Sequence, residues 1–371
     1  MSVSGTARQL TESERAWIET RSYLRENRTM LDAAAARRYP ALHRVADSAL
    51  LADTEWLPVA PFRLEDLVLE LASSTEQAET HLVTVSSAVP ARATGERYAG
   101  YAEAIGELVA PAVFEDRPTY RLLAADLTAE SPWMRFGLGT YFDSIDVGEA
   151  AAHEFVLDLR GNCGVPGVRS SIDNPCDPKQ RPVNLAITTV TIRRDPASDE
   201  KSFLLHWRDP RKVGHAGGMY QAVPVGIFQP SGYATWNIEN DFSLWRNMTR
   251  EFAEELAGAG EDHGSENAPI DYEAWEFAAT LDRARRDGTV TAYCLGLGAD
   301  PLTFATDLLT AVVIDGPVFD ALFGDVVSGN DEGQVLEWQP FAAEHVQALI
   351  DEYPVQAAGV AALRRAVSLL C

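Results

Sequence analysis

Basic residues are scarce in this chain. Its 371 residues include 31 Lys+Arg against 55 Asp+Glu, which gives a formal net charge of −24 at pH 7. Affinity for nucleic acid comes largely from Lys and Arg neutralising phosphates, so this balance predicts no nucleic acid partner. An anionic membrane surface is not expected as a partner for the same reason. A small anionic ligand would need a bound metal ion or a local group of arginines to attract it.

Cysteine is scarce too, and long apolar runs are lacking. The four cysteines show neither the paired spacing of a metal site nor a disulfide framework; they are Cys163, Cys176, Cys294 and Cys371. A reduced cytoplasmic setting is the simplest interpretation. No apolar run approaches the roughly 18 residues of a membrane span, and no secretion signal is recognisable. We therefore expect a cytoplasmic protein, and leave open whether it forms a homodimer.

Hydrophobic residues are plentiful, at 46% of a chain long enough for two domains. Residues 160–182 are rich in Gly, Pro, Asn and Asp, which is typical of a boundary loop. We expect a mixed α/β domain of unknown role over residues 1–165 and a second α/β domain over residues 178–371. The basic residues of the loop fit either substrate phosphates or a solvated linker; they are Arg160, Arg169, Lys179 and Arg181.

Two helical patterns stand out in the first domain. Residues 11–38 predict a long, largely exposed helix or helical pair, and Thr11 and Glu14 have the spacing of a capping box. Glu149 and His153 lie four residues apart on a second predicted helix. Their spacing allows a metal or acid–base site, although a histidine on an alanine-rich helix is more often structural.

The second half alternates strand and helix patterns, which predicts an α/β fold. Residues 183–193 and 202–207 are expected to form a hairpin. Further strands are predicted over 219–228, 290–297 and 306–314, and helices over 272–287, 343–353 and 355–370.

The most distinctive stretch is the helix predicted over residues 241–258. Apolar residues recur along it at helical spacing and form a stripe that would pack on a core: Leu244, Trp245, Met248, Phe252 and Leu256. Asp241 is the expected N-cap, and Gly258 is expected just after the C-cap.

The opposite edge of this helix carries Arg250, Glu251, Glu254 and Glu255. Residues three and four apart share a helix face, so the three carboxylates lie close together. Each pair would repel by about 1 kcal/mol at 4 Å in water, and Mg²⁺, which prefers hard oxygen ligands, would offset that repulsion. A solvated face with an Arg250–Glu254 ion pair is the alternative.

The hexamer REFAEE, residues 250–255, resembles the core of the Nudix box, whose pattern is GX5EX7REUXEEXGU with U a bulky aliphatic residue. Residues 223–232 look like the glycine-containing strand and loop before that box. Counted from Gly226, the first box glutamate falls on Gly232, so that carboxylate is missing or displaced to Glu239 or Asp241.

Other positions depart from the pattern as well. About ten extra residues, 233–242, separate loop from helix. Phe252 replaces the aliphatic residue, and Ala257 stands at the glycine position with Gly258 one place late. The resemblance covers roughly residues 180–371.

The resemblance implies a C-terminal Nudix-like α/β/α sandwich with a mixed sheet, whose box helix holds Mg²⁺ or Mn²⁺. Glu251, Glu254 and Glu255 would bind the metal, with one of them or a loop carboxylate as general base, and Arg250 would orient a carboxylate. The implied activity is hydrolysis of a nucleoside diphosphate linked to another group.

The same resemblance implies further site residues. A nucleotide-like ligand would meet residues before the helix, namely His206, His215, Tyr220, Gly226 and Trp236. A further acid is expected from a later loop, with Asp300, Asp315, Glu332 and Glu337 as candidates. Selectivity is expected in residues 233–242 and the N-terminal domain, because both flank the predicted cleft.

Two other functions stay open, because a fold does not fix a function. One is a ligand-binding or regulatory protein that does not hydrolyse its ligand. The other is a non-hydrolytic biosynthetic enzyme.

Overall fold

The structure is a computed structural model with an α/β fold. It describes residues 8–73, 89–111, 114–161, 167–208, 218–261, 263–324, 333–335 and 338–371. Among the helices within these ranges, none combines the length and the apolar character needed to cross a bilayer.

A mixed sheet of nine strands forms the centre of the molecule. Its strands, in sheet order, are β1 (His43–Arg44), β2 (Leu51–Ala52), β12 (Val290–Ala299), β13 (Thr306–Asp315), β7 (Leu185–Arg194), β8 (Lys201–Phe203) and β15 (Gln339–Pro340). In addition, β3 (Phe62–Arg63) pairs with β12, and β11 (Val225–Ile227) pairs with β7. β13 and β7 run parallel. Their nearly continuous aliphatic and β-branched sequences suit strands buried on both faces.

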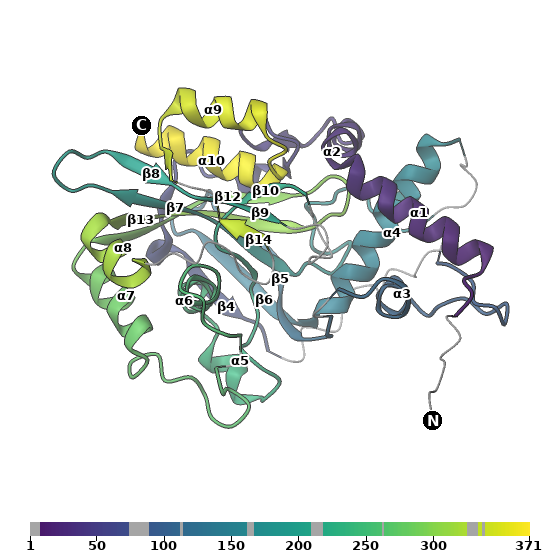
Figure 1. The fold of residues 1–371 in the computed structure, drawn as a ribbon, viewed down its shortest axis with the longest axis horizontal. Coiled ribbons are helices and arrows are strands. Elements are labelled where there is room, and N and C mark those ends of the chain that lie inside the picture. Colours follow the sequence, from purple (N-terminus) through teal and green to yellow (C-terminus); the bar gives the residue numbers. More distant parts are fainter. Residues whose placement is uncertain are drawn as a thin grey trace, which may run out of the picture.

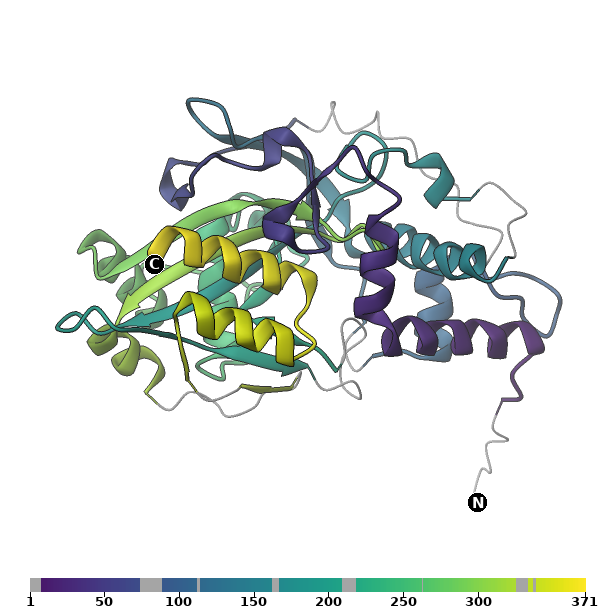
Figure 2. The ribbon, with the colours of Figure 1, turned by 90° about the horizontal axis from the view of Figure 1, so that it is seen from above.

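Helices cover both faces of this sheet (Figures 1 and 2). One face carries α9 (Ala343–Glu352) and α10 (Ala357–Leu370). The other carries α6 (Leu244–Glu255), α7 (Glu276–Arg286) and α8 (Gly316–Phe323), with the short α5 (Trp236–Asn240) ahead of α6. The second half of the chain is therefore an α/β/α arrangement with a mixed sheet, as predicted.

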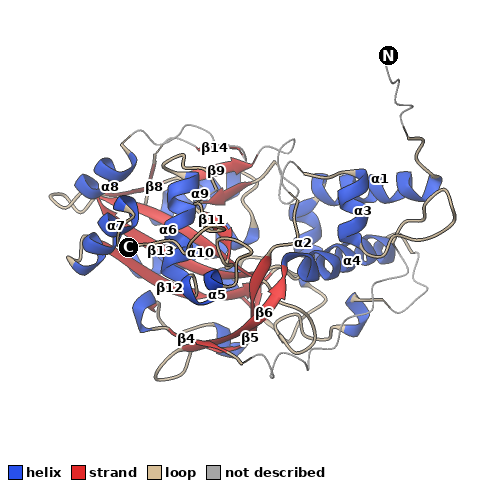
Figure 3. Ribbon diagram, turned by 90° about the horizontal axis from the view of Figure 1, so that it is seen from below, coloured by secondary structure: helices blue, strands red, loops and turns tan. Residues whose placement is uncertain are grey.

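The N-terminal helices gather at one end of the large sheet (Figure 3). They are α1 (Glu12–Glu26), α2 (Arg28–Ala36), α3 (Tyr101–Leu108) and α4 (Tyr141–Leu159). The capping box of Thr11 and Glu14 is confirmed. The predicted helical pair is confirmed as α1 and α2. It is not largely exposed, because Trp17, Leu24 and Leu31 are buried in clusters shared with α4.

Two smaller sheets complete the fold. One consists of β4 (Val68–Leu71), β6 (Trp133–Thr140) and β5 (Pro118–Asp126), and the other of β10 (Tyr220–Ala222), β9 (Leu205–Arg208) and β14 (Gly333–Val335). The single strand predicted over residues 219–228 is two strands. β10 pairs with β9, whereas β11 pairs with β7 after Pro224, which has no N–H to give to a ladder.

Residues from both sides of the predicted domain boundary build the large sheet. β1, β2 and β3 come from the first 63 residues, and β2 and β3 pair with β12. The apolar core is also shared, since Leu51 and Phe136 belong to the same cluster as Leu309. The division into 1–165 and 178–371 stays a prediction, and the sheet crosses it.

The predicted boundary loop is anchored to the rest of the protein. Arg169 donates hydrogen bonds to the carbonyls of Ala151 and Pro301. Arg181, which is buried, donates to the carbonyl of Pro175 and to the hydroxyl of Thr306. These two arginines therefore hold the loop, which accounts for their presence without a bound phosphate.

Candidate functional site

The helix predicted around the acidic edge is α6, and its apolar stripe is buried as expected. The predicted N-cap is wrong: Ser243 caps α6 by accepting a hydrogen bond from the backbone N–H of Arg246, and Asp241 lies at the end of α5. Gly258 has a φ of +72°, a left-handed conformation suited to glycine just after a helix. Ser243 has the same N-cap chemistry as Asp241, so sequence alone could not decide between them.

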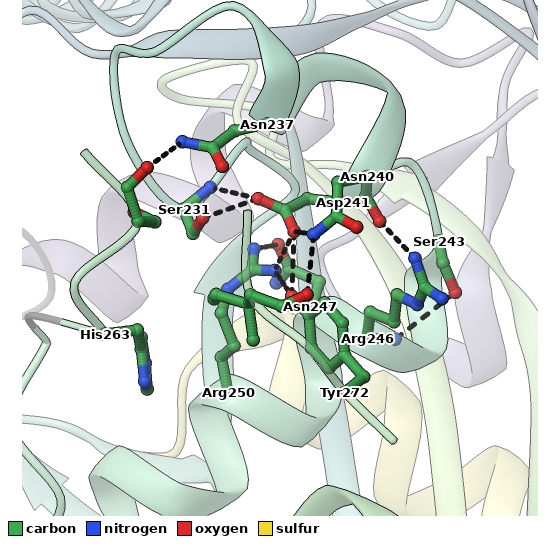
Figure 4. A network of polar contacts seen from close by, with 12 residues as sticks. Ser231, Asn237, Asn240, Asp241, Ser243, Arg246, Asn247, Arg250, His263 and Tyr272 are labelled. Carbon is green, nitrogen blue, oxygen red and sulfur yellow. Dashed lines mark hydrogen bonds and ion pairs between the residues drawn. The ribbon is translucent and has the colours of Figure 1, made fainter. Parts of the chain in front are cut away.

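Asp241 is instead the buried partner of Arg250 (Figure 4). The Tyr272 hydroxyl lies between them: it donates to Asp241 Oδ1 at 2.9 Å and accepts from Arg250 Nη1 at 2.6 Å. The second carboxylate oxygen of Asp241 accepts from the backbone N–H and the hydroxyl of Ser231 at 2.8 and 2.6 Å. Arg250 Nη2 also donates to the Gln229 carbonyl at 2.6 Å. Together these bonds tie the segment between β11 and α6 to the helix.

Burial and charge act against each other in this network. Burial lowers the pKa of Arg250, but Tyr272 and Asp241 outweigh it and raise that pKa above its ordinary value. Burial and the charge of Asp241 raise the pKa of the Tyr272 hydroxyl, against the opposing effect of Arg250. Arg250 therefore stays charged and Tyr272 stays neutral, as the hydrogen bonds require.

Asp241 and Glu239, the two candidates for a displaced carboxylate, have different surroundings. Asp241 faces Arg250 with 3.8 Å between Oδ1 and Nη1, whereas Glu239 is exposed. At Gly232, where the pattern places a glutamate, an added side chain would require neighbouring side chains to move. A Cβ there would lie 2.2 Å from Glu266 Oε1 and 2.8 Å from the Ser265 hydroxyl oxygen.

Two of the three carboxylates of α6 reach strand β11. Glu255 Oε1 accepts a hydrogen bond from the backbone N–H of Val225 at 2.7 Å. Glu251 lies over the next residue, Gly226, where an added Cβ would stand 1.9 Å from Oε1 and 2.5 Å from Oε2. Only glycine leaves space for that carboxylate, so the structure brings together Gly226, Glu251 and Glu255.

Glu254 has a different neighbour. Its Oε1 lies 2.9 Å from Nε2 of His263, whose ring packs against Trp275 with 5.1 Å between ring centroids. Both side chains are partly accessible, at 21% for Glu254 and 11% for His263. Sequence reasoning missed His263 because it lies in an acidic loop without a recognisable pattern. Its position nine residues after Glu254 was the one available signal.

Polar residues of β9 and β10 lie next to Glu255 and are called here the polar wall: His206, Arg208 and Gln221. His206 on β9 is fully buried, and its Nδ1 lies 3.7 Å from Glu255 Oε2. Gln221 on β10 is the register partner of His206, and Arg208 donates to Gln221 Oε1 at 3.2 Å. His206 is therefore near the acidic edge, as expected, while Arg208 and Gln221 were not anticipated.

Other predicted ligand-contacting residues lie elsewhere or outside the described ranges. Tyr220 packs edge-on against Tyr353, and as the neighbour of Gln221 it faces the other side of β10. Trp236 is 45% exposed on α5, and its indole N–H donates to the Ser265 carbonyl at 3.0 Å. His215 lies outside the described residues.

Two of the four candidates for a further acid lie within the described residues, and two lie outside them. Asp300 forms a buried ion pair with Arg28, and Asp315 lies 2.6 Å from Arg194 Nη2. Glu332 and Glu337 lie outside the described residues. Asp300 and Asp315 therefore have structural partners of their own.

The Glu149–His153 spacing on α4 also has a structural explanation. His153 Nε2 lies 3.5 Å from Glu149 Oε2, and Arg21 Nη2 lies 3.2 Å from Glu149 Oε1. The His153 ring stacks on Trp17 with 5.4 Å between centroids. Burial raises the pKa of Glu149, but Arg21 and His153 outweigh it and hold that pKa below its ordinary value.

The acidic edge can be compared with what Mg²⁺ requires. Within the described ranges, no group of three or more His, Cys, Asp and Glu side chains is arranged to hold a metal ion. Mg²⁺ is usually held by only one or two carboxylates, with water and substrate phosphates completing its coordination. Glu251 and Glu255, set over adjacent residues of β11, have the oxygen chemistry for such a shared site.

Comparisons with known proteins are sparse. No protein-family model matches the chain, and a search of curated proteins gives no match. A solved structure similar to it is that of a MutT/nudix family protein from Enterococcus faecalis, at 15% identity and a TM-score of 0.23. The similarity covers 43% of this chain and 44% of that one. A likeness at this level carries no argument about family or activity.

Proposed function

We propose that this protein is a metal-dependent hydrolase of a diphosphate, with a nucleoside diphosphate linked to another group as its substrate class. The observation that carries the proposal is the placement of Glu251 and Glu255 over Val225 and Gly226. The resemblance of residues 223–258 to the Nudix box supports the same function. Mg²⁺ or Mn²⁺ is the proposed cofactor.

In the proposed mechanism the carboxylates of α6 have different roles, according to the groups that each one contacts. Bound Mg²⁺ would neutralise charge on the diphosphate and assist attack by water. Glu251 and Glu255 would hold the ion, and Glu254, hydrogen-bonded to His263, would accept the proton of the attacking water. Arg250 contacts no substrate in this scheme. Its bonds to Tyr272 and the Gln229 carbonyl fix the segment that precedes the helix.

A second candidate is ligand binding without hydrolysis. It is favoured by the protein contacts that two of the carboxylates already make, Glu255 with the Val225 N–H and Glu254 with His263. A site with these contacts would recognise a nucleotide-like metabolite and leave it intact. Conversion of the ligand separates the two candidates.

The test is Mg²⁺-dependent product release from a pooled panel of nucleoside diphosphate conjugates. Glu254→Gln and Glu255→Gln should each abolish release while the protein stays folded. Glu149→Gln is the matched control, because Glu149 is also a helical glutamate beside a histidine. Release that persists in both α6 variants would refute the assignment of the acidic edge. A folded wild-type protein that binds a conjugate without converting it would favour the second candidate.

A further inference from the structure

The polar wall of β9 and β10 is positioned to take part in ligand binding. His206 and Gln221 are partners in antiparallel register, so their side chains lie on the same face of this small sheet. Arg208, two residues along β9, lies on that face as well. His206 lies 3.7 Å from Glu255, which shows that this face is turned toward the acidic edge of α6.

The side-chain amide nitrogen of Gln221 is a buried hydrogen-bond donor whose acceptor is not yet identified. It is 2% exposed, and within the described part of the chain its amide nitrogen has no hydrogen-bond partner. Arg208 donates to the amide oxygen at 3.2 Å, which fixes the orientation of the amide group and leaves the nitrogen as a donor. Buried amide donors are normally satisfied, by protein, water or a ligand.

The charge of Arg208 suits a negatively charged acceptor. In a protein of net charge −24, an anionic substrate needs local positive charge near the acidic edge. A guanidinium next to a fixed amide donor provides that charge together with directional hydrogen bonds.

We propose that Arg208 and Gln221, beside His206, form an anion subsite that binds a phosphate group of the substrate next to Glu255. The subsite deepens the proposed function and rests on it. One phosphate would share the cation with Glu251 and Glu255, and the neighbouring phosphate would accept hydrogen bonds from the Arg208 guanidinium and the Gln221 amide. Arg208 and Gln221 thereby select for a diphosphate over a monophosphate.

The test measures binding and does not depend on turnover. Inorganic pyrophosphate and inorganic phosphate are titrated into the full chain in the presence of Mg²⁺ by isothermal titration calorimetry. Pyrophosphate should bind the wild type more tightly than phosphate does. Arg208→Gln should weaken pyrophosphate binding about 10- to 100-fold, as expected for loss of a charge-assisted hydrogen bond.

Two further variants keep the test specific. Gln221→Glu keeps an oxygen for Arg208 but replaces the amide donor by a charged oxygen, so it should weaken pyrophosphate binding at least about 10-fold. Arg193→Gln is the control, because Arg193 pairs with the exposed Asp320 at the other end of β7. It removes the same charge and should leave binding unchanged. Thermal unfolding of each variant checks that it is folded.

The outcomes separate this inference from the proposed function. Unchanged pyrophosphate affinity in folded Arg208→Gln, or equal affinity of the wild type for phosphate and pyrophosphate, would overturn the subsite. If conjugates are hydrolysed with an unaltered KM in Arg208→Gln, only the subsite fails. If pyrophosphate binding depends on Arg208 and no conjugate is hydrolysed, only the hydrolase proposal fails.

Discussion

Two helices of this protein each place a glutamate beside a histidine, and their surroundings differ. On α4, Glu149 is paired with both His153 and Arg21, and the histidine is stacked on Trp17. On α6, Glu254 contacts His263 from a separate loop, and the neighbouring glutamates reach strand β11. The same residue types therefore pair within one helix, beside an arginine, in one place. In the other they pair between a helix and a loop, next to glutamates that reach β11.

The comparison shows that spacing alone does not identify a site. Glu149 and His153 have the regular i,i+4 spacing of a sequence motif, yet Glu149 is already paired with Arg21 and His153. Glu254 and His263 have no regular spacing, and His263 comes from a loop and not from the same helix. What distinguishes them is the set of groups that surround each carboxylate.

The largest expected effect is on turnover in Glu255→Gln. The amide oxygen of glutamine can still accept from the Val225 N–H, so the helix should stay in place, but one charged metal ligand is lost. Loss of several kcal/mol of charge stabilisation predicts a fall in kcat/KM of about 1000-fold. Steady-state kinetics with saturating Mg²⁺ would check this. A fall in kcat/KM of less than about threefold would show that Glu255 is not a metal ligand.

Gly226→Ala should be next in size. The new Cβ would stand 1.9 Å from Glu251 Oε1, so the carboxylate must move away from β11. We expect a loss of turnover of about 100-fold and a cost of about 1–3 kcal/mol in unfolding free energy. Gly260→Ala would serve as a control for unfolding, because no heavy atom lies within 4 Å of a Cβ built there. Normal turnover in Gly226→Ala would contradict the proposed placement of Glu251.

Glu149→Gln should change stability and leave turnover unaltered. The pKa of Glu149 is held below its ordinary value of 4.5 by Arg21 and His153 against the effect of burial, so its charge favours folding above about pH 4.5. That contribution is lost as the pH falls through the lower folded pKa. We expect a destabilisation of about 2–3 kcal/mol at pH 7 that shrinks in acid. Urea unfolding at pH 7 and pH 3 would measure it, and an equal cost at both pH values would argue against the ion pair.

The smallest effect is expected for His263→Gln. Glutamine can still hydrogen-bond to Glu254, but an amide cannot exchange a proton as an imidazole can. We expect kcat to fall about 10-fold with little change in KM and in thermal stability. The corresponding change on α4, His153→Gln, should lower the unfolding temperature and leave kcat unchanged, because the ring of His153 is buried against Trp17. If His153→Gln lowered kcat and His263→Gln lowered only the unfolding temperature, the α4 pair would be functional and the α6 pair structural.

Much of the fold could be predicted from local pattern. β7, β12, β13 and α10 lie within a few residues of their predicted positions, because their aliphatic and periodic sequences carry strong signals. The two-residue strands β1, β2 and β3 carry no such signal. β2 and β3 form by pairing with β12, more than 200 residues away in sequence.

The site could be predicted only in part. The acidic edge of α6 follows from residues three and four apart, and Gly226 from its place before the helix. The partners of that edge come from loops and a separate sheet: Asp241 and Tyr272 for Arg250, His263 for Glu254, and His206 for Glu255. No rule of helix or strand spacing specifies contacts between separate elements.

The central claim is that the edge of α6 is functional and the matching pair on α4 is structural. The most direct measurement compares Mg²⁺-dependent turnover and unfolding free energy for Glu254→Gln and Glu149→Gln in parallel. We predict that Glu254→Gln loses turnover and keeps its stability, whereas Glu149→Gln keeps its turnover and loses stability. Full turnover in a folded Glu254→Gln protein would contradict the account.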